Sequence, residues 1–595
     1  SISAIFDRII QYLLKYITHR SSLPCLERLL SDSNQPPAEY PSITQTLLSL
    51  INGETADIIV QCISNIVKSI NHMDEDYYGL LKQALITIIQ TYPDARQNVY
   101  ECFANCTNIA PRIISEDIVG ISGFMIQDLS NQPSFDMIDK TALAISEIVR
   151  IIPQTFSEQA LNFTQIFSMF LEQNIQNVLQ DEGEDEDDFG ECQQLQETCG
   201  NVLVALSDLI SAYTQQLATH APPIIETINK FLTSQEPELI IGAAQSITAL
   251  SPLFTSLGIH PNTLVTTIID VIDDKSRDPD SSAIITVSIQ DLFSAFTAIL
   301  YHCGTIISDE ALLKTGSFIT ECLDLKVSII LDSQSKSIEN DFQISVIQAM
   351  EAFILGGAFS NYNEKPRFLE ILMKCVNDSR GKKLMQSNAC SIVAEICYIM
   401  PEQSNETATV LVQSIFAKLS ANQKMSIQCR ISYYRSLMFL LMSHSALFTP
   451  EMVANIAQMV IGSYQAEQMG NNDGVLTSSV LLLIAFAVYH VPISDEVLSS
   501  CLSKAPSIDS EYLPIFTHCL LLIYKIKPEI QNNALLGKLA LHAIASSDWC
   551  ISKIENSEFQ FLVDFVKSGA ITQEMILQLM EYNQSIILKI QQKLA

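Results

Sequence analysis

Five prolines follow apolar helical patterns, and this recurrence constrains the fold of the 595-residue chain more than any other feature. Counting back from each proline, the fifth, eighth and ninth residues are apolar or cysteine; Ile148, Ile145 and Ala144 precede the second proline in this way. This spacing places the three side chains on one face of a helix. Because proline cannot continue a helix without losing a backbone hydrogen bond, each predicts a helix end. The prolines are Pro111, Pro153, Pro252, Pro401 and Pro492.

Serine followed by acidic residues marks the expected start of the next helix in several places. A serine side chain can cap free backbone N–H groups, and acids in the first turn suit the helix dipole. The repeating unit is therefore a helix, a proline or polar turn, a capped helix and a polar loop. The four serines are Ser115, Ser157, Ser308 and Ser494.

The spacing of the prolines gives the length of this unit. Pro111 and Pro153 are 42 residues apart, and Pro401 and Pro492 are 91 apart, which corresponds to two units. A period of about 40–47 residues is typical of HEAT and armadillo helix pairs. No alternating strand pattern competes. The sequence therefore predicts an all-α fold: a HEAT-repeat α-solenoid of antiparallel helix pairs forming one continuous superhelix over 1–595, with 556–595 as C-terminal capping helices.

The clearest single helix is predicted at 192–217. Its apolar stripe follows steps of three and four residues and contains Leu195, Cys199, Val202, Leu206, Leu209 and Tyr213. The expected partner helix is 223–232. A new pair is expected to begin at 237–254, where the small residue Gly242 allows close helix approach, and to be completed by 260–274.

The acidic stretch 181–191, DEGEDEDDFGE, is the strongest charge feature of the sequence. Between 151 and 274 there are eighteen Asp and Glu and a single Lys, in a chain whose net charge is −32. Because a run of like charges repels itself, 181–191 is predicted to be a mobile acidic loop between helices. Its candidate protein-binding residues are Asp181, Glu182, Glu184, Asp185, Glu186, Asp187, Asp188 and Glu191.

Two interpretations of this loop remain open. Acidic runs are often solubilising linkers. Alternatively, the loop and the acidic repeats on either side of it bind long basic segments of a partner through many weak contacts on a concave surface. The net charge disfavours nucleic acid and anionic lipid as partners and favours basic proteins.

Composition and motifs exclude several further classes. Fifteen scattered cysteines without a CxxC motif indicate buried, reduced thiols. The strongest apolar run, 480–489, is half the length of a membrane span and is predicted to be a buried helix. No phosphate-binding glycine loop, HExxH motif or GxSxG motif is present. We therefore expect no enzymatic activity, no cofactor and no catalytic or metal-binding residue.

Two weaker candidates for a site have ordinary structural explanations. His302–Cys303 and His518–Cys519 lie inside apolar helical patterns, where adjacent residues face apart, so neither pair is expected to bind a metal. A cluster of cations at 365–383 is either a solvated loop or a site for an acidic partner. It comprises Lys365, Arg367, Lys374, Arg380, Lys382 and Lys383.

Tandem helix pairs interrupted by an acidic inter-helix segment resemble the importin-β (karyopherin-β) family. The resemblance is best over 182–325, where EGEDEDDFGECQQLQETCGNVLVALSDLISAYTQQL is followed by HAPPIIETINKFL and PELIIGAAQSITALSPLF. This order of elements is similar to the middle of the beta-3 importin branch. The match is one of pattern, without a diagnostic short motif.

The resemblance implies a nuclear transport receptor that binds basic cargo proteins and releases them under control of the Ran GTPase. It also implies contacts with nuclear-pore repeat proteins and a location in both cytoplasm and nucleus. We expect a monomer with no direct nucleic-acid binding and no membrane span. The alternative is a non-transport HEAT-repeat scaffold or adaptor, such as a phosphatase scaffold, a coat subunit or a cytoskeletal adaptor.

Overall fold

The computed structural model describes residues 2–572 with gaps, together with 576, 587, 590, 591, 593 and 594. The gaps are 17–20, 34–35, 71, 132, 181–188, 235, 278–281, 324–335, 378–382, 422–424, 468–472, 490–492, 505–511 and 547. Throughout this described part, every regular element is a helix and none is a strand. The predicted all-α fold is confirmed.

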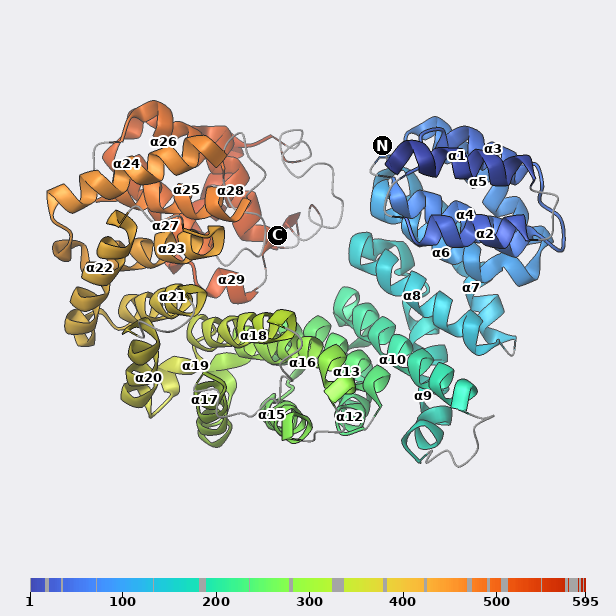
Figure 1. Cartoon of the computed structure of the whole chain (residues 1–595), viewed down its shortest axis with the longest axis horizontal. Helices are drawn as coiled ribbons and strands as arrows, with labels where there is room; N and C mark the ends of the chain where they lie inside the picture. Colours follow the sequence, from blue (N-terminus) through green and yellow to red (C-terminus); the bar gives the residue numbers. More distant parts are fainter. Residues whose placement is uncertain are drawn as a thin grey trace. The chain divides into compact units, whose positions relative to one another are not determined.

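The chain divides into two compact units, Ser1–Ile259 and His260–Ala595. Within each unit, consecutive long helices alternate between two layers, so that each pair contributes one helix to each layer (Figure 1). This alternation is the arrangement of a HEAT-like solenoid, and the predicted helix pairs are confirmed. Continuity of one solenoid over 1–595 stays a prediction.

In the first unit, the first layer contains α1 (Ile2–Lys15), α3 (Tyr40–Leu48), α5 (Glu75–Thr91), α7 (Pro111–Ser130), α9 (Ala160–Gln180) and α12 (Ala221–Leu232). The second layer contains α2 (Ser22–Ser31), α4 (Ala56–Ser69), α6 (Arg96–Ile109), α8 (Phe135–Ile151), α10 (Phe189–Ala212) and α13 (Pro237–Leu250). Two short helices, α11 (Thr214–Leu217) and α14 (Phe254–Leu257), follow α10 and α13. Neighbours in the second layer contact one another along the whole series from α2 to α13.

In the second unit, the first layer contains α15 (Asn262–Arg277), α17 (Asp309–Leu323), α20 (Lys365–Asn377), α22 (Asn405–Ser420), α24 (Pro450–Glu467) and α26 (Asp495–Leu502). The second layer contains α16 (Ser282–Cys303), α18 (Lys336–Leu355), α21 (Lys383–Ile399), α23 (Ile427–His444), α25 (Asp473–Val488) and α27 (Leu513–Ile526). A short helix, α19 (Ala358–Asn361), follows α18. The unit ends with α28 (Asn533–Ala545), α29 (Asp548–Ser552), α30 (Asn556–Phe565) and a π-helical turn, Val566–Ala570. The capping role of 556–595 stays a prediction, because much of 573–595 lies outside the described residues.

Four of the five prolines follow a helix end, as predicted, whereas Pro492 lies outside the described residues. Helices α6, α8, α13 and α21 each end two residues before their proline. The predicted stripe is buried: Ile145 and Ile148 are 0% exposed and Ala144 is 2% exposed. Local sequence alone therefore determines where these helices end and which face they bury.

Two of the four serines cap a helix as predicted, and two do not. Ser157 lies in a turn three residues before α9, which begins at Ala160. The hydroxyl oxygen of Ser494 accepts a hydrogen bond from the backbone N–H of Val497 at 3.4 Å, and Ser308 caps α17 in the same way at 3.5 Å. Ser115, however, lies inside α7, which begins at Pro111. Proline suits the first helical position, because the N–H that it lacks would have no intrahelical partner there.

The predicted pairing of helices near α10 is also wrong by one helix. Helix α9 is the partner of α10, and α12 is the partner of α13. Helix α10 ends at Ala212, and Pro222 and Pro223 lie in the first turn of α12, which begins at Ala221. The acidic segment therefore connects the two helices of one pair.

Helices α10 and α13 approach closely at two glycines. An ideal Cβ on Gly242 would lie 2.6 Å from the Cα of Gly200, and a Cβ on Gly200 would lie 2.8 Å from the carbonyl oxygen of Glu238. Neither distance permits a side chain. The prediction that Gly242 allows close helix approach is confirmed.

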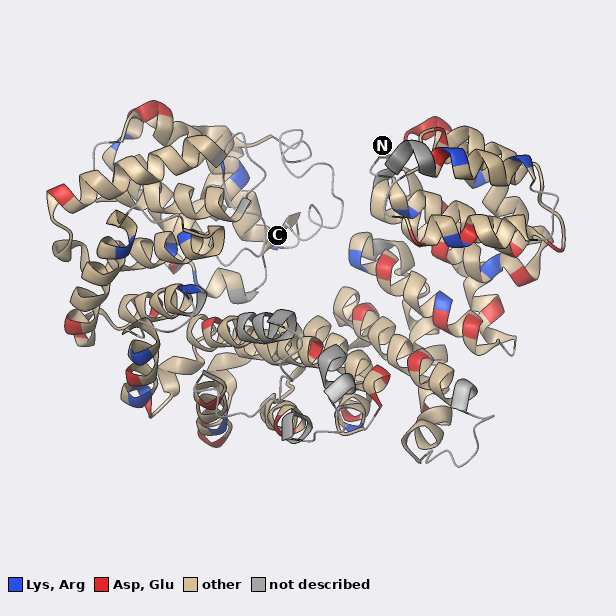
Figure 2. Ribbon diagram, viewed as in Figure 1, with Lys and Arg blue, Asp and Glu red and all other residues tan. Residues whose placement is uncertain are grey.

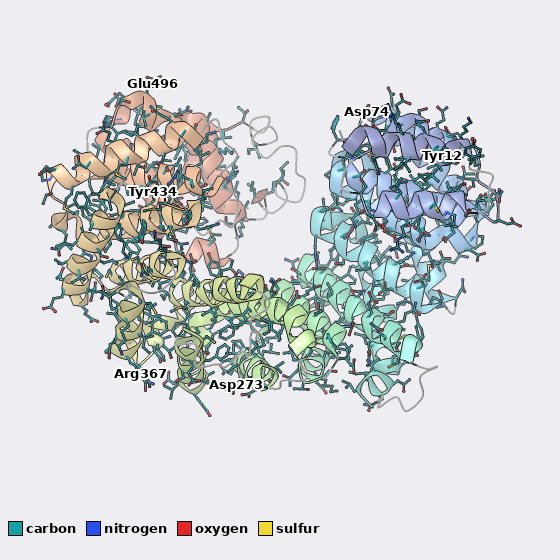
Figure 3. The ribbon with its side chains drawn as sticks, in the orientation of Figure 1. Tyr12, Asp74, Asp273, Arg367, Tyr434 and Glu496 are labelled. Carbon is teal, nitrogen blue, oxygen red and sulfur yellow. The ribbon has the colours of Figure 1, made fainter. Side chains whose placement is uncertain are left out.

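Apolar side chains fill the space between the layers (Figure 3). In the second unit Tyr434 lies in this interior at 2% exposed, and its hydroxyl group bonds the Ser463 hydroxyl at 2.8 Å. All fifteen cysteines are free thiols. Cys25 is exposed, Cys192 and Cys375 are half-buried, and the others are buried. The predicted burial of most thiols is confirmed.

Two apolar stretches belong to the protein interior. In α25, residues 480–486 are at most 4% exposed, which confirms a buried helix. By length and composition alone, one stretch in the described part, Pro237–Leu257, could cross a membrane, and 56% of its apolar window is buried inside the protein. This stretch includes α13, whose Gly242 contacts α10.

Candidate protein-binding surface

The predicted acidic loop connects α9 to α10. Residues 181–188 lie outside the described residues, and with them Asp181, Glu182, Glu184, Asp185, Glu186, Asp187 and Asp188. Helix α10 begins at Phe189, three residues before the predicted start. Glu191 therefore belongs to the first turn of α10. The role of all eight residues in binding stays a prediction.

Amide side chains join neighbouring helices of the second layer by donating hydrogen bonds to carboxylates. Asn201 of α10 donates to Asp139 of α8 at 2.8 Å, and Gln97 of α6 donates to Asp136 of α8 at 3.0 Å. Such bonds fix the register between consecutive helices, and each is worth about 1 kcal/mol or more because the acceptor is charged. The remaining pairs are Asn65–Glu27, Asn98–Asp57 and Asn108–Glu147.

The sequence separation between the two residues of each pair gives the length of the repeat. It is 38 to 41 residues between α2, α4, α6 and α8, but 62 residues between α8 and α10. The bond from the Ser146 hydroxyl group to Asp208 also spans 62 residues. The extra residues lie between α8 and α9, between α9 and α10 and at the start of α10. The acidic segment is thus part of an insertion into one helix pair of an otherwise regular series.

Seven carboxylates extend across the second layer from α4 to α13, and we call them the second-layer acid row. Asp136, Glu147 and Glu197 are exposed, and the other four are half-buried. Every helix from α4 to α13 in this layer contributes at least one. The row consists of Asp57, Glu101, Asp136, Asp139, Glu147, Glu197 and Glu238.

Burial and mutual repulsion raise the pKa values of several carboxylates in the row. Burial raises the pKa of Glu197, and the charges of Asp139 and Glu238 raise it further. The pKa of Asp139 is raised chiefly by burial and also by Asp136. Burial likewise raises the pKa of Glu147, with a smaller contribution from Glu101. The row is therefore a region of negative potential whose charges are incompletely compensated.

Three cations partly compensate the row between α4 and α8. Burial raises the pKa values of Asp57, Asp139 and Glu147; Lys140 opposes this rise at Asp57 and Asp139, and Lys68 and Arg150 oppose it at Glu147. Lys140 donates to the side-chain oxygen of Asn98, and Nε of Arg150 lies 2.9 Å from Oδ2 of Asp208. Asp208 is only 5% exposed, and burial raises its pKa despite Arg150. Helices α10 and α13 contain no Lys or Arg, whereas Lys230 of the first layer pairs with Glu226. Figure 2 shows acidic positions without basic ones along α10 and α13.

Sequence reasoning found the charge of 151–274 but missed most of the row, because Asp57, Glu101, Asp136, Asp139 and Glu147 precede residue 151. Within α8, the polar residues at 136, 139, 140, 147 and 150 lie at helical spacing opposite the buried stripe, with the exposed Leu143 as the one apolar position among them. This pattern would have identified Asp136, Asp139 and Glu147, the three residues of the row that lie on α8. The contacts between α8 and α10 across 62 residues have no local signal.

The basic cluster at 365–383 is largely paired in the described part of the chain. Arg367 lies 3.4 Å from Glu364, and Lys374 lies 2.9 Å from Glu370. Lys365 donates to the backbone carbonyl of Ser360 at 2.6 Å. Lys383 begins α21, whereas Arg380 and Lys382 lie outside the described residues. These contacts support the interpretation as a solvated segment.

Comparisons with known proteins give a structural likeness only. No family model and no curated protein matches the sequence. The chain is similar to crystal structures of Kap121p bound to Ste12p, Kap121p bound to Nup53p, and the karyopherin Kap121p bound to the SUMO protease Ulp1p. Each alignment covers 98% of this chain and 68% of the other, at 12% identity, with TM-scores of 0.40, 0.40 and 0.39 respectively. A TM-score this low carries no weight for function.

Proposed function

We propose that the first unit binds a Lys- and Arg-rich segment of a partner protein along the second-layer acid row, with the acidic segment 181–191 as a second attachment site. This proposal rests on the row itself. Its carboxylates lie on consecutive helices of one layer, and several of them have raised pKa values. A cation close to these groups would relieve their mutual repulsion.

The form of the ligand follows from the spacing of the row. Its residues are distributed over five consecutive helices rather than gathered at one point. An extended segment with several basic residues can contact many of them at once, whereas one exposed ion pair contributes about 1 kcal/mol or less. Such a ligand gains both association rate and affinity from the field of the row.

The biological role proposed is that of a nuclear transport receptor. It would carry basic cargo proteins, release them when the Ran GTPase binds, contact nuclear-pore repeat proteins and move between cytoplasm and nucleus. The resemblance over 182–325 and the position of the acidic segment inside one helix pair support this role.

Affinity capture from nuclear and cytosolic extracts, with and without GTP-locked Ran, tests the role. A transport receptor should retain basic nuclear proteins and release them when GTP-locked Ran is added, while GDP-bound Ran should have no effect. Capture of the same proteins regardless of Ran would identify a scaffold instead. That outcome would not affect the proposed binding of basic segments, which the affinity of a Lys- and Arg-rich peptide tests separately.

A further inference from the structure

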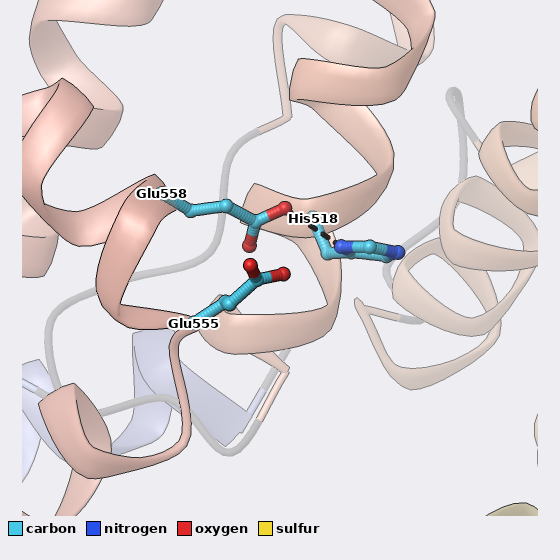
Figure 4. A group of neighbouring side chains, drawn as sticks. All are labelled: His518, Glu555 and Glu558. Carbon is cyan, nitrogen blue, oxygen red and sulfur yellow. Dashed lines mark hydrogen bonds and ion pairs between the residues drawn. The ribbon is translucent and has the colours of Figure 1, made fainter.

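Three potential metal ligands converge in the second unit, far in sequence from the acid row. His518 lies on α27, Glu555 precedes α30 and Glu558 lies in the first turn of α30. One donor atom of each residue lies within 4.8 Å of the other two. Figure 4 shows the two carboxylates facing each other, with the imidazole edge directed at Glu558. The Nδ1 atom of His518 and the Oε1 atom of Glu558 are 2.7 Å apart.

The burial of Glu558 is an independent indication of a ligand. Glu558 is only 9% exposed, and its ion-pair partner among the described residues is His518, which is a cation only when protonated. Buried carboxylates are almost always paired with a cation or coordinated to a metal, because an isolated buried charge is costly. Its single hydrogen-bond partner in the described part is His518. A second carboxylate, Glu555, close to it makes a compensating cation more favourable still.

The donors also match one class of metal. An imidazole nitrogen with carboxylate oxygens suits Zn²⁺ and similar transition-metal ions, whereas Mg²⁺ and Ca²⁺ prefer oxygen ligands only. Three protein ligands leave one position of a tetrahedral Zn²⁺ ion for solvent. The side chain of His518 is 40% exposed, so solvent can reach this position. Binding would replace the hydrogen bond and move Nδ1 and Oε1 from 2.7 Å apart to about 3.3 Å.

We propose that His518, Glu555 and Glu558 form a binding site for a divalent transition-metal ion of the Zn²⁺ class. The ion joins α30 to α27 and so fastens the last described helix to the preceding repeat. No metal was expected at His518 from the sequence, because the only potential ligand near it in the sequence is the adjacent Cys519. Cys519 is buried whereas His518 is partly exposed, and the carboxylates come from the start of α30, about 40 residues later.

Zn²⁺ titration of the metal-free full chain tests the site. We expect one Zn²⁺ ion whose affinity falls more than about tenfold in E555Q and in the double variant E555Q/E558Q. Excess Mg²⁺ should not displace it. Glu555 is exposed, so E555Q should retain the fold. H260Q, at an exposed histidine in the same unit, is the matched control and should bind Zn²⁺ like the wild type.

Co²⁺ substitution distinguishes this site from the fifteen thiols. Visible d–d bands without a near-ultraviolet thiolate charge-transfer band are expected, and E555Q should lose them. Zn²⁺ should also raise the melting temperature of the wild type more than that of E555Q. A thiolate band, or equal Zn²⁺ affinity of wild type and E555Q/E558Q, would show that the three residues bind no metal.

Discussion

At the scale of single residues, the carboxylates of the acid row are less stable in their charged form than free carboxylates. Asp139 and Glu197 have raised pKa values, because burial and neighbouring carboxylates disfavour the charge. Between its unfolded and folded pKa values, such a group binds more protons in the folded state. Its contribution to stability therefore grows as the pH falls through that window and is lost as the pH rises.

Replacing Asp139 by Asn and Glu197 by Gln removes this dependence. We expect the stability of the double variant relative to the wild type to be greatest at neutral pH and to decline as the pH falls into the mildly acidic range. Urea unfolding of both proteins across this range measures the difference. An advantage that grows as the pH falls would contradict the raised pKa values.

Arg435 shows the opposite case, a buried cation that compensates acids. It pairs with Glu351 of α18 and Glu395 of α21, and its guanidinium group stacks on the rings of Phe439 and Tyr512. Glu395 is only 1% exposed. Breaking such a pair from one side leaves a buried charge uncompensated.

Arg435→Met should destabilise the second unit by about 3–5 kcal/mol. Arg367→Met, which removes an exposed pair, should cost about 1 kcal/mol or less. Thermal unfolding of the two variants compares them directly. Equal melting temperatures would mean that the network around Arg435 contributes little.

The thiols provide a further test at this scale. Burial raises the pKa of Cys199, Cys303 and Cys519 to about 12 and that of Cys397 to about 11, so these groups are not reactive thiolates at neutral pH. A thiol reagent applied to the native protein should react quickly with Cys25 and more slowly with Cys192 and Cys375. Fast reaction of more than half of the fifteen would contradict the buried positions.

At the scale of elements, the close crossing of α10 and α13 is the strictest packing requirement next to the acidic segment. Gly242→Ala should cost about 1–3 kcal/mol, because its Cβ has no room. Gly120→Ala is the control: it lies in α7 with no atom within 4 Å of a Cβ, and should stabilise by about 0.5–1 kcal/mol. Chemical denaturation of both variants measures the two changes in the free energy of unfolding. A Gly242 variant as stable as the Gly120 variant would show that the two helices can separate without cost.

The same elements show how far the sequence alone predicts the fold. Helix ends at prolines and buried faces at three- and four-residue steps depend on local chemistry, and α6, α8, α13 and α21 follow them. Pairing depends on tertiary contacts: α9 rather than α12 is the partner of α10, and Ser115 lies inside a helix that begins at Pro111. The contacts that join the acid row across helices, and those within the cluster around His518, link residues 39 to 62 positions apart. No local sequence pattern predicts such contacts.

At the scale of the whole molecule, negative charge is concentrated where the repeat series is interrupted. Residues 151–274 contain eighteen acids and one Lys, and the separation within polar pairs increases there from about 40 residues to 62. The regular helix pairs form the scaffold. The acidic segment between α9 and α10 adds negative charge to it and contains no Lys or Arg. Attraction of this kind should weaken as salt shortens the Debye length.

The most direct test is the affinity of a fluorescent Lys- and Arg-rich peptide, measured by anisotropy from low to physiological salt. In the row variant, Asp139, Glu197 and Glu238 are replaced by their amides; in the control variant, the exposed residues Glu116, Glu158 and Glu172 outside the second layer are replaced in the same way. A third variant replaces the acids of 181–191 by Ser and Asn.

We predict that the row variant binds more weakly by between about threefold and a hundredfold, since each lost pair costs about 1 kcal/mol or less. Its affinity should also depend less steeply on salt, and the 181–191 variant should show the same two changes. The control variant, with the same loss of charge as the row variant, should bind like the wild type. Equal affinities and equal salt slopes for row and control variants would contradict binding along the second layer.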